Sequence, residues 1–182
     1  GIGLILTGED VRDLGSLPCL FNLEVNPFTG PPYPILAHGE VRHVGDAVAF
    51  VVADTIDQAR DAVEAIEVHW TPLPAVAGVV NAIRKDAPQV WPGHPGNVLF
   101  DAPIGDKKAT EAAFAKAHAV AEISIVNPRV ITNFIETRAA VCEYDARRDH
   151  LTLTTGSQGS HRLREILCGT ILKIPFEKMR VV

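Results

Sequence analysis

The residues best suited to bind a ligand lie in Thr154-Thr-Gly-Ser-Gln-Gly-Ser160, which the neighbouring pattern places between a strand and a helix. Small residues let the backbone turn sharply and let a ligand approach it closely. Free N–H groups at the helix start favour an anionic or oxo ligand, and the Gln158 amide can donate a hydrogen bond without adding charge. From residue types alone, however, an ordinary Gly/Ser turn with an N-cap serine is the commoner explanation of such a stretch.

Three other groups of residues are weaker candidates for chemistry. Glu136 and Arg138 stand at i, i+2 on a predicted strand, where such charges face solvent more often than they form a site. Glu9-Asp10 is most simply a pair at a helix start that complements the helix dipole. Ser157 and His161 are four residues apart, but a serine nucleophile also needs an orienting group. We expect His161 to be a partly buried helix residue.

Several well-defined catalytic and metal-binding motifs are absent from the sequence. It contains no Walker A sequence, no G-x-G-x-x-G and no G-x-S-x-G. No two histidines stand at i, i+4 on a predicted helix and no C-x-x-C pair exists, so zincin, zinc-ribbon and thioredoxin-like sites have no support. The cysteines, Cys19, Cys142 and Cys168, are far apart. They favour a reducing, cytoplasmic location with buried and unreactive thiols.

The composition excludes several classes of protein. The 182 residues carry 17 Lys+Arg against 22 Asp+Glu, a formal net charge of −5, and 47% are hydrophobic while 21% are charged. This is the balance of a folded protein rather than a disordered chain. Mild acidity without a Lys/Arg-rich run argues against nucleic acid as a partner. The longest strongly apolar run, residues 47–53, cannot span a bilayer, and no signal peptide is visible, so we expect a soluble protein.

The first half of the chain predicts a compact α/β unit. Residues 46–53 form a β-branched apolar run that is typical of a buried strand. Thr55-Ile-Asp-Gln58 fits a capping box at the start of an amphipathic helix, and residues 66–70 follow with a strand-like pattern. Before this unit, the Pro- and Gly-rich residues 15–40 predict an extended surface loop.

The second half follows another Pro/Gly-rich stretch, residues 86–105, which is the best candidate for a domain boundary. The expected elements are a helix over 106–117 with Phe114 as its largest anchor, strands near 119–127, 138–144, 150–155 and 178–182, and a helix from about Ser160 that Pro175 ends. Both ends of the sequence lie in strand-like apolar runs, and a complete domain seldom begins or ends inside a core strand. We therefore interpret the chain as a piece of a longer polypeptide.

Four stretches form a specific pattern when they are taken together. They are Gly3-Leu-Ile-Leu-Thr-Gly-Glu-Asp-Val11, His38-Gly-Glu-Val-Arg-His-Val-Gly-Asp-Ala-Val-Ala49, residues 57–76 with Val68-His-Trp-Thr-Pro-Leu-Pro-Ala-Val76 at their end, and Pro95-Gly-Asn-Val98. In order, they resemble the V-x-x-V-L-T-G-E-D opening, the D-G-x-V-R-Y-V-G-Q-P-V-A and V-x-Y-x-P-L-P-A-V patterns and the P-G-N linker of one family. That family is the large, molybdopterin-binding subunit of xanthine dehydrogenase, aldehyde oxidase and carbon monoxide dehydrogenase.

Two further stretches extend the resemblance towards the cofactor. Asn133-Phe-Ile-Glu-Thr-Arg138 is similar to the family's N-x-x-E-x-R strand, and Thr155-Gly-Ser-Gln-Gly-Ser-His161 to T-S-T-Q-G-P-H, with Ser160 in place of a common proline. In the family this glutamine approaches the oxo group of the molybdenum centre. The resemblance therefore implies that Gln158, with its neighbour Gly159, is a cofactor-binding position, and it reverses the preference for an ordinary turn.

The resemblance implies an α+β fold in three parts. These are an α/β-hammerhead domain over residues 1–87, a Pro/Gly-rich linker and short helix over 88–118, and the first strands and helix of the molybdopterin-binding domain over 119–182. The family's glycine-rich G-G-G-F-G segment is expected soon after Val182, and its catalytic glutamate near the far end of the subunit. No catalytic residue and no metal ligand is therefore expected in this chain.

The resemblance also implies a molybdenum hydroxylase, in which water supplies oxygen to the carbon of an aldehyde, an N-heterocycle or a CO-like substrate. The cofactor would be molybdenum–molybdopterin, including its cytosine dinucleotide form, and electrons would pass to iron–sulfur clusters and FAD on partner domains or subunits. The expected partners are the remainder of the large subunit, the iron–sulfur and flavin subunits, and further copies of the complex in a homo-oligomer. The alternative is a non-catalytic hammerhead scaffold or binding domain.

Overall fold

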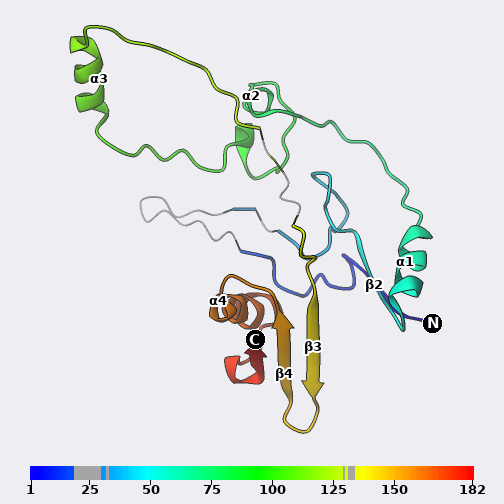
Figure 1. Ribbon diagram of the computed structural model, residues 1–182. Helices are drawn as coiled ribbons and strands as arrows, with labels where there is room; N and C mark the ends of the chain where they lie inside the picture. The colour runs from blue at the N-terminus through cyan, green and yellow to red at the C-terminus, as the bar shows by residue number, and fades with distance from the viewer. Residues whose placement is uncertain (19–29, 32, 129, 131–133) are drawn as a thin grey trace.

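The computed structural model describes residues 1–18, 30–31, 33–128, 130 and 134–182 of the 182-residue chain. The described strands form a two-stranded sheet, β1–β2, and a three-stranded sheet in the order β3–β4–β5. Figure 1 shows that long irregular segments carry helices α2 and α3 away from these sheets. Cys19 and Asn133 lie outside the described residues.

The first sheet is built from the N-terminal apolar run and the predicted strand near residue 50. β1 (Ile2–Thr7) pairs antiparallel with β2 (Ala49–Ala53), with an irregularity of register between Ile2 and Leu4. Helix α1 (Ile56–Glu64) follows β2 directly and packs against both strands. The strand, the helix and their order were predicted correctly, although β2 begins three residues later than expected.

The cap of α1 forms only half of the predicted capping box. The Thr55 side chain accepts a hydrogen bond from the Gln58 backbone N–H at 3.3 Å, which confirms Thr55 as the N-cap. The Gln58 side-chain oxygen instead accepts a hydrogen bond from the amino group of Gly1 at 3.2 Å. That amino group also pairs with Asp54, so the start of the chain is held against the start of the helix.

Two predicted strands are not formed among the described residues. Residues 66–70 and 119–127 carry the expected patterns, but both are irregular in the structure and pair with no described strand. Most of their apolar side chains are exposed, Trp70 to 60% and Ile123 to 80%. A strand is stabilised by the neighbour to which it hydrogen-bonds, and the described residues supply none here. The strand–helix–strand unit therefore lacks its last strand, and β2 pairs with β1 instead.

Residues 8–13 form turns rather than the expected helix start. The Asp10 carboxylate accepts hydrogen bonds from the backbone N–H and the hydroxyl of Thr7, both at 2.7 Å. These bonds lower the pKa of Asp10. Glu9 pairs with Arg12 at 2.8 Å and with His38 at 3.2 Å. The helix-dipole role proposed for Glu9-Asp10 is therefore wrong, because local side-chain bonds close a turn at this point.

The middle of the chain is mostly irregular. It contains α2 (Val79–Ala82), a short 3-10 helix (Pro95–Asn97) and α3 (Lys107–Lys116). The Asp106 side chain caps α3 by accepting from the Ala109 N–H at 2.9 Å, so the predicted helix is confirmed. Phe114 is exposed rather than buried, so its expected role as an anchor is not seen among the described residues.

The second sheet contains the predicted hairpin and the C-terminal strand. β3 (Ala140–Asp145) pairs antiparallel with β4 (His150–Thr155), and β4 pairs parallel with β5 (Met179–Val181). The crossover from β4 to β5 is α4 (Ser160–Glu165), which continues as a π-helical segment, Ile166–Leu172. We refer to residues 160–172 as the crossover helix. Figure 1 shows it beside the sheet.

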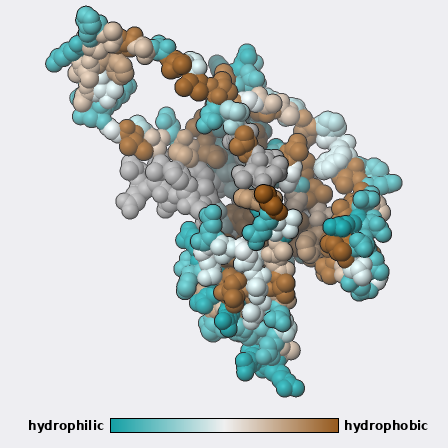
Figure 2. Space-filling model, viewed as in Figure 1, coloured by the Kyte–Doolittle hydropathy of each residue, from teal (hydrophilic) through white to brown (hydrophobic). Residues whose placement is uncertain are grey.

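Few side chains are buried in the described part of the chain. The buried hydrophobic residues are Leu36, Cys168, Ile171 and Met179. Three of them lie on the crossover helix or on β5, so the most enclosed packing is between these two elements. Figure 2 shows hydrophobic side chains on the visible surface, including the extended stretches near α3. None of the described helices is long and apolar enough to cross a membrane.

A cluster of ionisable groups joins the β3–β4 hairpin to the segment before β5. The Tyr144 hydroxyl donates to one Asp149 carboxylate oxygen at 2.9 Å, and Lys178 donates to the other. The bond from Lys178, followed by the one from Tyr144, lowers the pKa of Asp149. The Asp149 carboxylate in turn raises the pKa of Lys178 and of Tyr144.

Replacing Asp149 by asparagine should lower the thermal unfolding midpoint at pH 7 by a small amount. Asparagine tolerates the left-handed φ of 49° at this position, so the backbone is not strained. The change removes the charge and replaces one of the two acceptor oxygens by an amide nitrogen. Because the folded pKa of Asp149 lies below its unfolded value, its contribution is present above about pH 4 and is lost as the pH falls through the folded pKa. Melting curves of both proteins from pH 7 to pH 3 should therefore converge at the acidic end. A difference that stays constant with pH would contradict the charge-based explanation.

Candidate functional site

The turn between β4 and the crossover helix exposes hydrogen-bond donors. Gly159 is the N-cap with an extended φ of 176°, and no side chain caps the helix, so the N-cap serine of the ordinary-turn explanation is not found. Gln158 is exposed, and a Cβ added at Gly156 would meet nothing within 4 Å. The turn therefore offers open space, the first N–H groups of the helix and a neutral side-chain amide.

Three chain segments meet at the edge of the sheet that carries this turn. The Thr155 N–H donates to the Val182 carbonyl at 3.1 Å, and its hydroxyl donates to the Ala139 carbonyl at 2.9 Å. Because β4 and β5 are parallel, their carboxyl ends lie together, and the antiparallel β3 begins at the same edge. Gln158 therefore lies at the carboxyl edge of the sheet, where α/β proteins commonly bind ligands.

The weaker candidates form no site of their own. Glu136 and Arg138 are exposed on an irregular segment and do not pair with each other, and the Arg138 guanidinium lies 5.4 Å from the Phe134 ring centre. This agrees with the expectation that both charges are solvated. Ser157 and His161 share no hydrogen bond. His161 is exposed, so the prediction that it is partly buried is wrong. Among the described residues no three His, Cys, Asp or Glu side chains are grouped to hold a metal ion.

The described cysteines differ in their surroundings. Cys168 is fully buried in the crossover helix, and its burial raises the pKa of the thiol, which disfavours the reactive thiolate. Cys142 lies exposed on β3. The expectation of buried thiols is therefore confirmed for Cys168 and wrong for Cys142.

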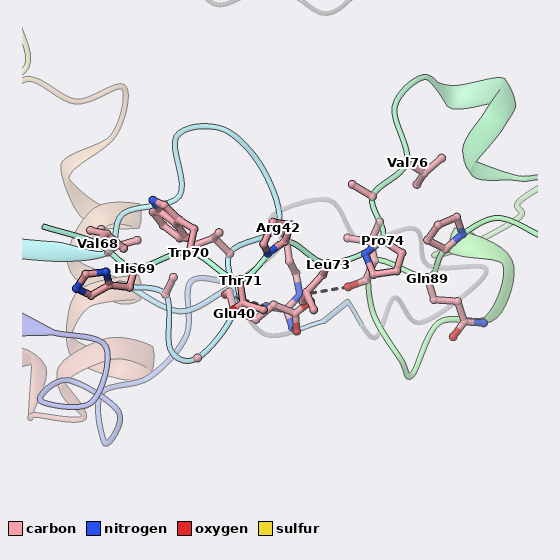
Figure 3. A pocket seen from close by; sticks show the side chains of 18 residues that line it. Glu40, Arg42, Val68, His69, Trp70, Thr71, Leu73, Pro74, Val76 and Gln89 are labelled. Carbon is pink, nitrogen blue, oxygen red and sulfur yellow. Dashed lines mark hydrogen bonds and ion pairs between the residues drawn. The ribbon is translucent and has the colours of Figure 1, made fainter.

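A hollow of about 570 Å³ lies away from the Gln158 turn. It is bordered by residues 37–48, 68–76 and 88–90, and Figure 3 shows Arg42 and Trp70 among its side chains. The Arg42 guanidinium is already engaged, since it donates to the Val90 carbonyl at 3.2 Å, pairs with Glu40 at 2.9 Å and lies 3.7 Å from the Trp91 ring centre. It therefore fastens residues 88–91 to residues 40–42 and is not free to bind a charged ligand.

Asn97 is a structural residue that reasoning from the sequence did not single out. Its side-chain oxygen accepts from the Val90 N–H at 2.8 Å, and its side-chain nitrogen donates to the carbonyls of Ala82 at 2.8 Å and Pro88 at 2.9 Å. Its φ is 56°, a left-handed conformation that asparagine adopts more readily than most residues. The signal in the sequence is the asparagine of the Pro95-Gly-Asn97 motif.

The donors at the Gln158 turn fit a cofactor with oxo or phosphate-like oxygen atoms. Uncapped N–H groups at a helix start attract such acceptors, and the open space at Gly156 lets one approach the backbone. The described residues supply no ligand set for the metal itself. The arrangement is thus suited to hold the oxygen-rich periphery of a cofactor and to donate one neutral hydrogen bond.

Comparisons with known proteins define the class of the chain. Residues 1–74 match the aldehyde oxidase and xanthine dehydrogenase a/b hammerhead domain, and residues 90–182 match the molybdopterin cofactor-binding domain. The chain belongs to the family of molybdopterin-binding large subunits of carbon monoxide dehydrogenase, xanthine dehydrogenase and aldehyde oxidoreductase. The expected α+β fold, a hammerhead domain followed by part of the molybdopterin-binding domain, is confirmed.

Individual relatives support this assignment over the whole chain. The carbon monoxide dehydrogenase large chain of Hydrogenophaga pseudoflava is 31% identical over all of this chain and 23% of its own length. The solved carbon monoxide dehydrogenase of Oligotropha carboxidovorans is 30% identical with a TM-score of 0.87, over all of this chain and 23% of that one. Quinoline 2-oxidoreductase of Pseudomonas putida 86 gives 31% and 0.84, over all of this chain and 22% of that one. The chain thus spans less than a quarter of these relatives.

Proposed function

We propose that these 182 residues form the N-terminal part of the large subunit of a molybdenum hydroxylase and contribute one contact to its cofactor. The observation that carries the proposal is the position of the Gln158 turn at the shared carboxyl edge of β4 and β5, with uncapped helix N–H groups. A longer chain that continues beyond Val182 would enter the same edge, because Val182 lies beside Thr155. Cofactor-binding residues from both segments would then meet there.

In this proposal the protein holds and orients a cofactor that carries the hard chemistry. Bound molybdenum–molybdopterin would supply the two-electron oxidation and the transfer of oxygen derived from water. Gln158 would donate its side-chain amide to an oxygen atom of the cofactor, and the N–H groups next to Gly159 would face the same acceptor. A neutral donor strengthens its hydrogen bond as the acceptor gains negative charge, without fixing a permanent charge at the site.

The finer parts of the proposal follow from the relatives. Their names describe oxidation of carbon monoxide, aldehydes, xanthine and N-heterocycles, so we propose a small electrophilic carbon substrate of this kind. The cytosine dinucleotide form of the cofactor, iron–sulfur and FAD electron partners, a homo-oligomeric complex and a cytoplasmic location belong to the proposal as well. The domain limits at residues 87 and 118 also stay predictions.

Metal analysis of the complete large subunit tests the proposal. It should be purified with its co-expressed partner subunits, and its molybdenum content and hydroxylase activity measured on an aldehyde, an N-heterocycle and carbon monoxide. Near-stoichiometric molybdenum with activity on one substrate class is expected. A folded complex without molybdenum would instead favour the alternative of a non-catalytic hammerhead scaffold.

The 182-residue polypeptide expressed alone should retain almost no molybdenum and show no hydroxylase activity. The physical reason is that the described residues offer donors to the cofactor at one turn only, and a single hydrogen-bonded contact does not balance the cost of ordering a ligand. Inductively coupled plasma analysis of the purified chain, beside the complete subunit as the positive control, is the measurement. Near-stoichiometric molybdenum in the short chain would contradict this prediction.

A further inference from the structure

Gly15 lies against the carboxyl half of the crossover helix with no space for a side chain. A Cβ added at Gly15 would lie 1.7 Å from the Thr170 carbonyl oxygen and 3.2 Å from the Ile171 Cα. The Gly15 N–H donates to the Ile171 carbonyl at 3.0 Å. This is a contact between two backbones, so neither side can yield by changing a rotamer. It joins a residue of the matched hammerhead domain to a residue of the matched cofactor-binding domain.

The element that Gly15 touches is the one that begins at the Gln158 turn. The crossover helix runs without interruption from Ser160 to Leu172, so its two ends form one body. Around the contact, Ile171 is buried and Lys173 donates to the Asp13 carbonyl at 3.5 Å. The amino end of the helix joins β4 through the short glycine-containing turn, and α4 also packs against β5. The direction of the helix is thus fixed by its packing on β5 and by the Gly15 contact at its carboxyl half.

We infer that Gly15 is a positioning residue for the proposed cofactor contact, acting through the crossover helix on Gln158. The inference rests on the proposed function, because it concerns the orientation of the turn towards the cofactor. An added methyl group at Gly15 must move the Thr170 carbonyl by more than 1 Å to reach ordinary contact distance. Packed interiors transmit such displacements rather than absorb them, so the far end of the helix moves as well.

The experiment compares Gly15→Ala with Gly93→Ala in the complete, cofactor-loaded enzyme. Gly93 is the matched control, because a Cβ there would meet nothing within 4 Å. Four quantities are measured for each protein: molybdenum content, kcat per molybdenum, KM, and the electron paramagnetic resonance spectrum of the partly reduced molybdenum. We expect Gly15→Ala to keep its molybdenum and its KM, to lose about 10–10²-fold in kcat, as misplacement by about 1 Å can cause, and to shift the spectrum. Gly93→Ala should match the parent enzyme.

A double-mutant cycle with Gln158→Ala tests whether the effect passes through that residue. If it does, Gly15→Ala added to Gln158→Ala lowers kcat little further, because the contact that it displaces is already gone. Additive losses would overturn the inference, and so would a Gln158→Ala variant with unchanged kcat or a Gly15→Ala variant that behaves like Gly93→Ala. An enzyme without molybdenum would instead overturn the proposed function.

A second variant covers the case in which Gly15→Ala does not fold. Ile171→Val leaves the backbone contact with Gly15 in place, but it removes one buried methyl group from the packing that holds the helix beside that contact, and it adds no atoms. It should lower kcat per molybdenum by less than Gly15→Ala does and leave KM unchanged. In an enzyme that already carries Gln158→Ala, it should lower kcat little further. An Ile171→Val enzyme with unchanged kcat and spectrum would overturn the inference.

Discussion

Replacing Gln158 by alanine should lower turnover per bound molybdenum by about 10²–10³-fold, the loss typical of removing one donor to a developing negative charge. The residue lies exposed between Gly156 and Gly159, so its side chain contributes little to the fold and its removal creates no cavity. The net charge of the site does not change. Turnover must be divided by molybdenum content, so that lost cofactor is not counted as lost chemistry.

Glu136→Gln is the matched control for this prediction. Glu136 is also exposed and lies on the segment that leads into β3, which meets the same edge of the sheet through the Thr155–Ala139 hydrogen bond. It should therefore change turnover much less than Gln158→Ala. Unchanged turnover in Gln158→Ala would return Gln158 to the role of an ordinary turn residue, and an equal loss in both variants would indicate a general disturbance of this edge.

Replacing Asn97 by alanine should lower the local stability of residues 82–97 by about 2–4 kcal/mol, because three hydrogen bonds to the backbone are lost together. The change removes the acceptor of the Val90 N–H and the donor to the Ala82 and Pro88 carbonyls. Alanine also adopts the left-handed φ of 56° less readily. Hydrogen exchange at the Val90 amide measures the effect, and exchange should accelerate by about one to three orders of magnitude.

Three companion variants separate the causes. Asn97→Gly permits the left-handed φ but removes the hydrogen bonds, so it isolates their share. Asn97→Asp keeps the acceptor for Val90 and loses the two donated bonds. Asn81→Ala removes an exposed amide with a single bond to the Ala77 carbonyl at 3.1 Å, and it should cost much less. Equal effects of Asn81→Ala and Asn97→Ala would show that Asn97 does not organise this segment.

Elements whose signals are local could be predicted from the sequence. The cap at Thr55, the hairpin of β3 and β4 and the start of the crossover helix each depend on residues within about ten positions, and all three were predicted. The Gln158 turn belongs to the same group, since the strand before it and the helix after it have clear patterns. Its place at the edge of the sheet follows from these two elements.

The errors arise where distant partners decide the structure. Residues 66–70 and 119–127 have strand patterns, but whether a strand forms depends on a neighbour that periodicity does not supply. The role of Gly15 depends on backbone atoms far along the chain, so its residue type alone gave no signal. The Pro95-Gly-Asn97 motif marks Asn97, but it does not show which backbone groups the side chain binds. At Glu9-Asp10 a local partner decides the structure instead. Thr7 donates hydrogen bonds to the Asp10 carboxylate, and these bonds close a turn where a helix start was predicted.

The contact between the N-terminal turn and the crossover helix has a consequence for the timing of folding. The Lys173 ammonium and the Asp13 backbone carbonyl, which form a hydrogen bond beside this contact, are separated by 160 positions. At synthesis rates of about 5–20 residues per second, the N-terminal turn waits roughly 8–30 s on the ribosome before its partner is made. During that interval the apolar side chains of β1 and β2 are already present, and several of them are about half exposed even in the folded chain, Ile2 to 47% and Phe50 to 56%. Nascent chains of this protein should therefore depend on chaperones during synthesis. Slower synthesis of the segment that contains Cys168 and Ile171 should extend that dependence.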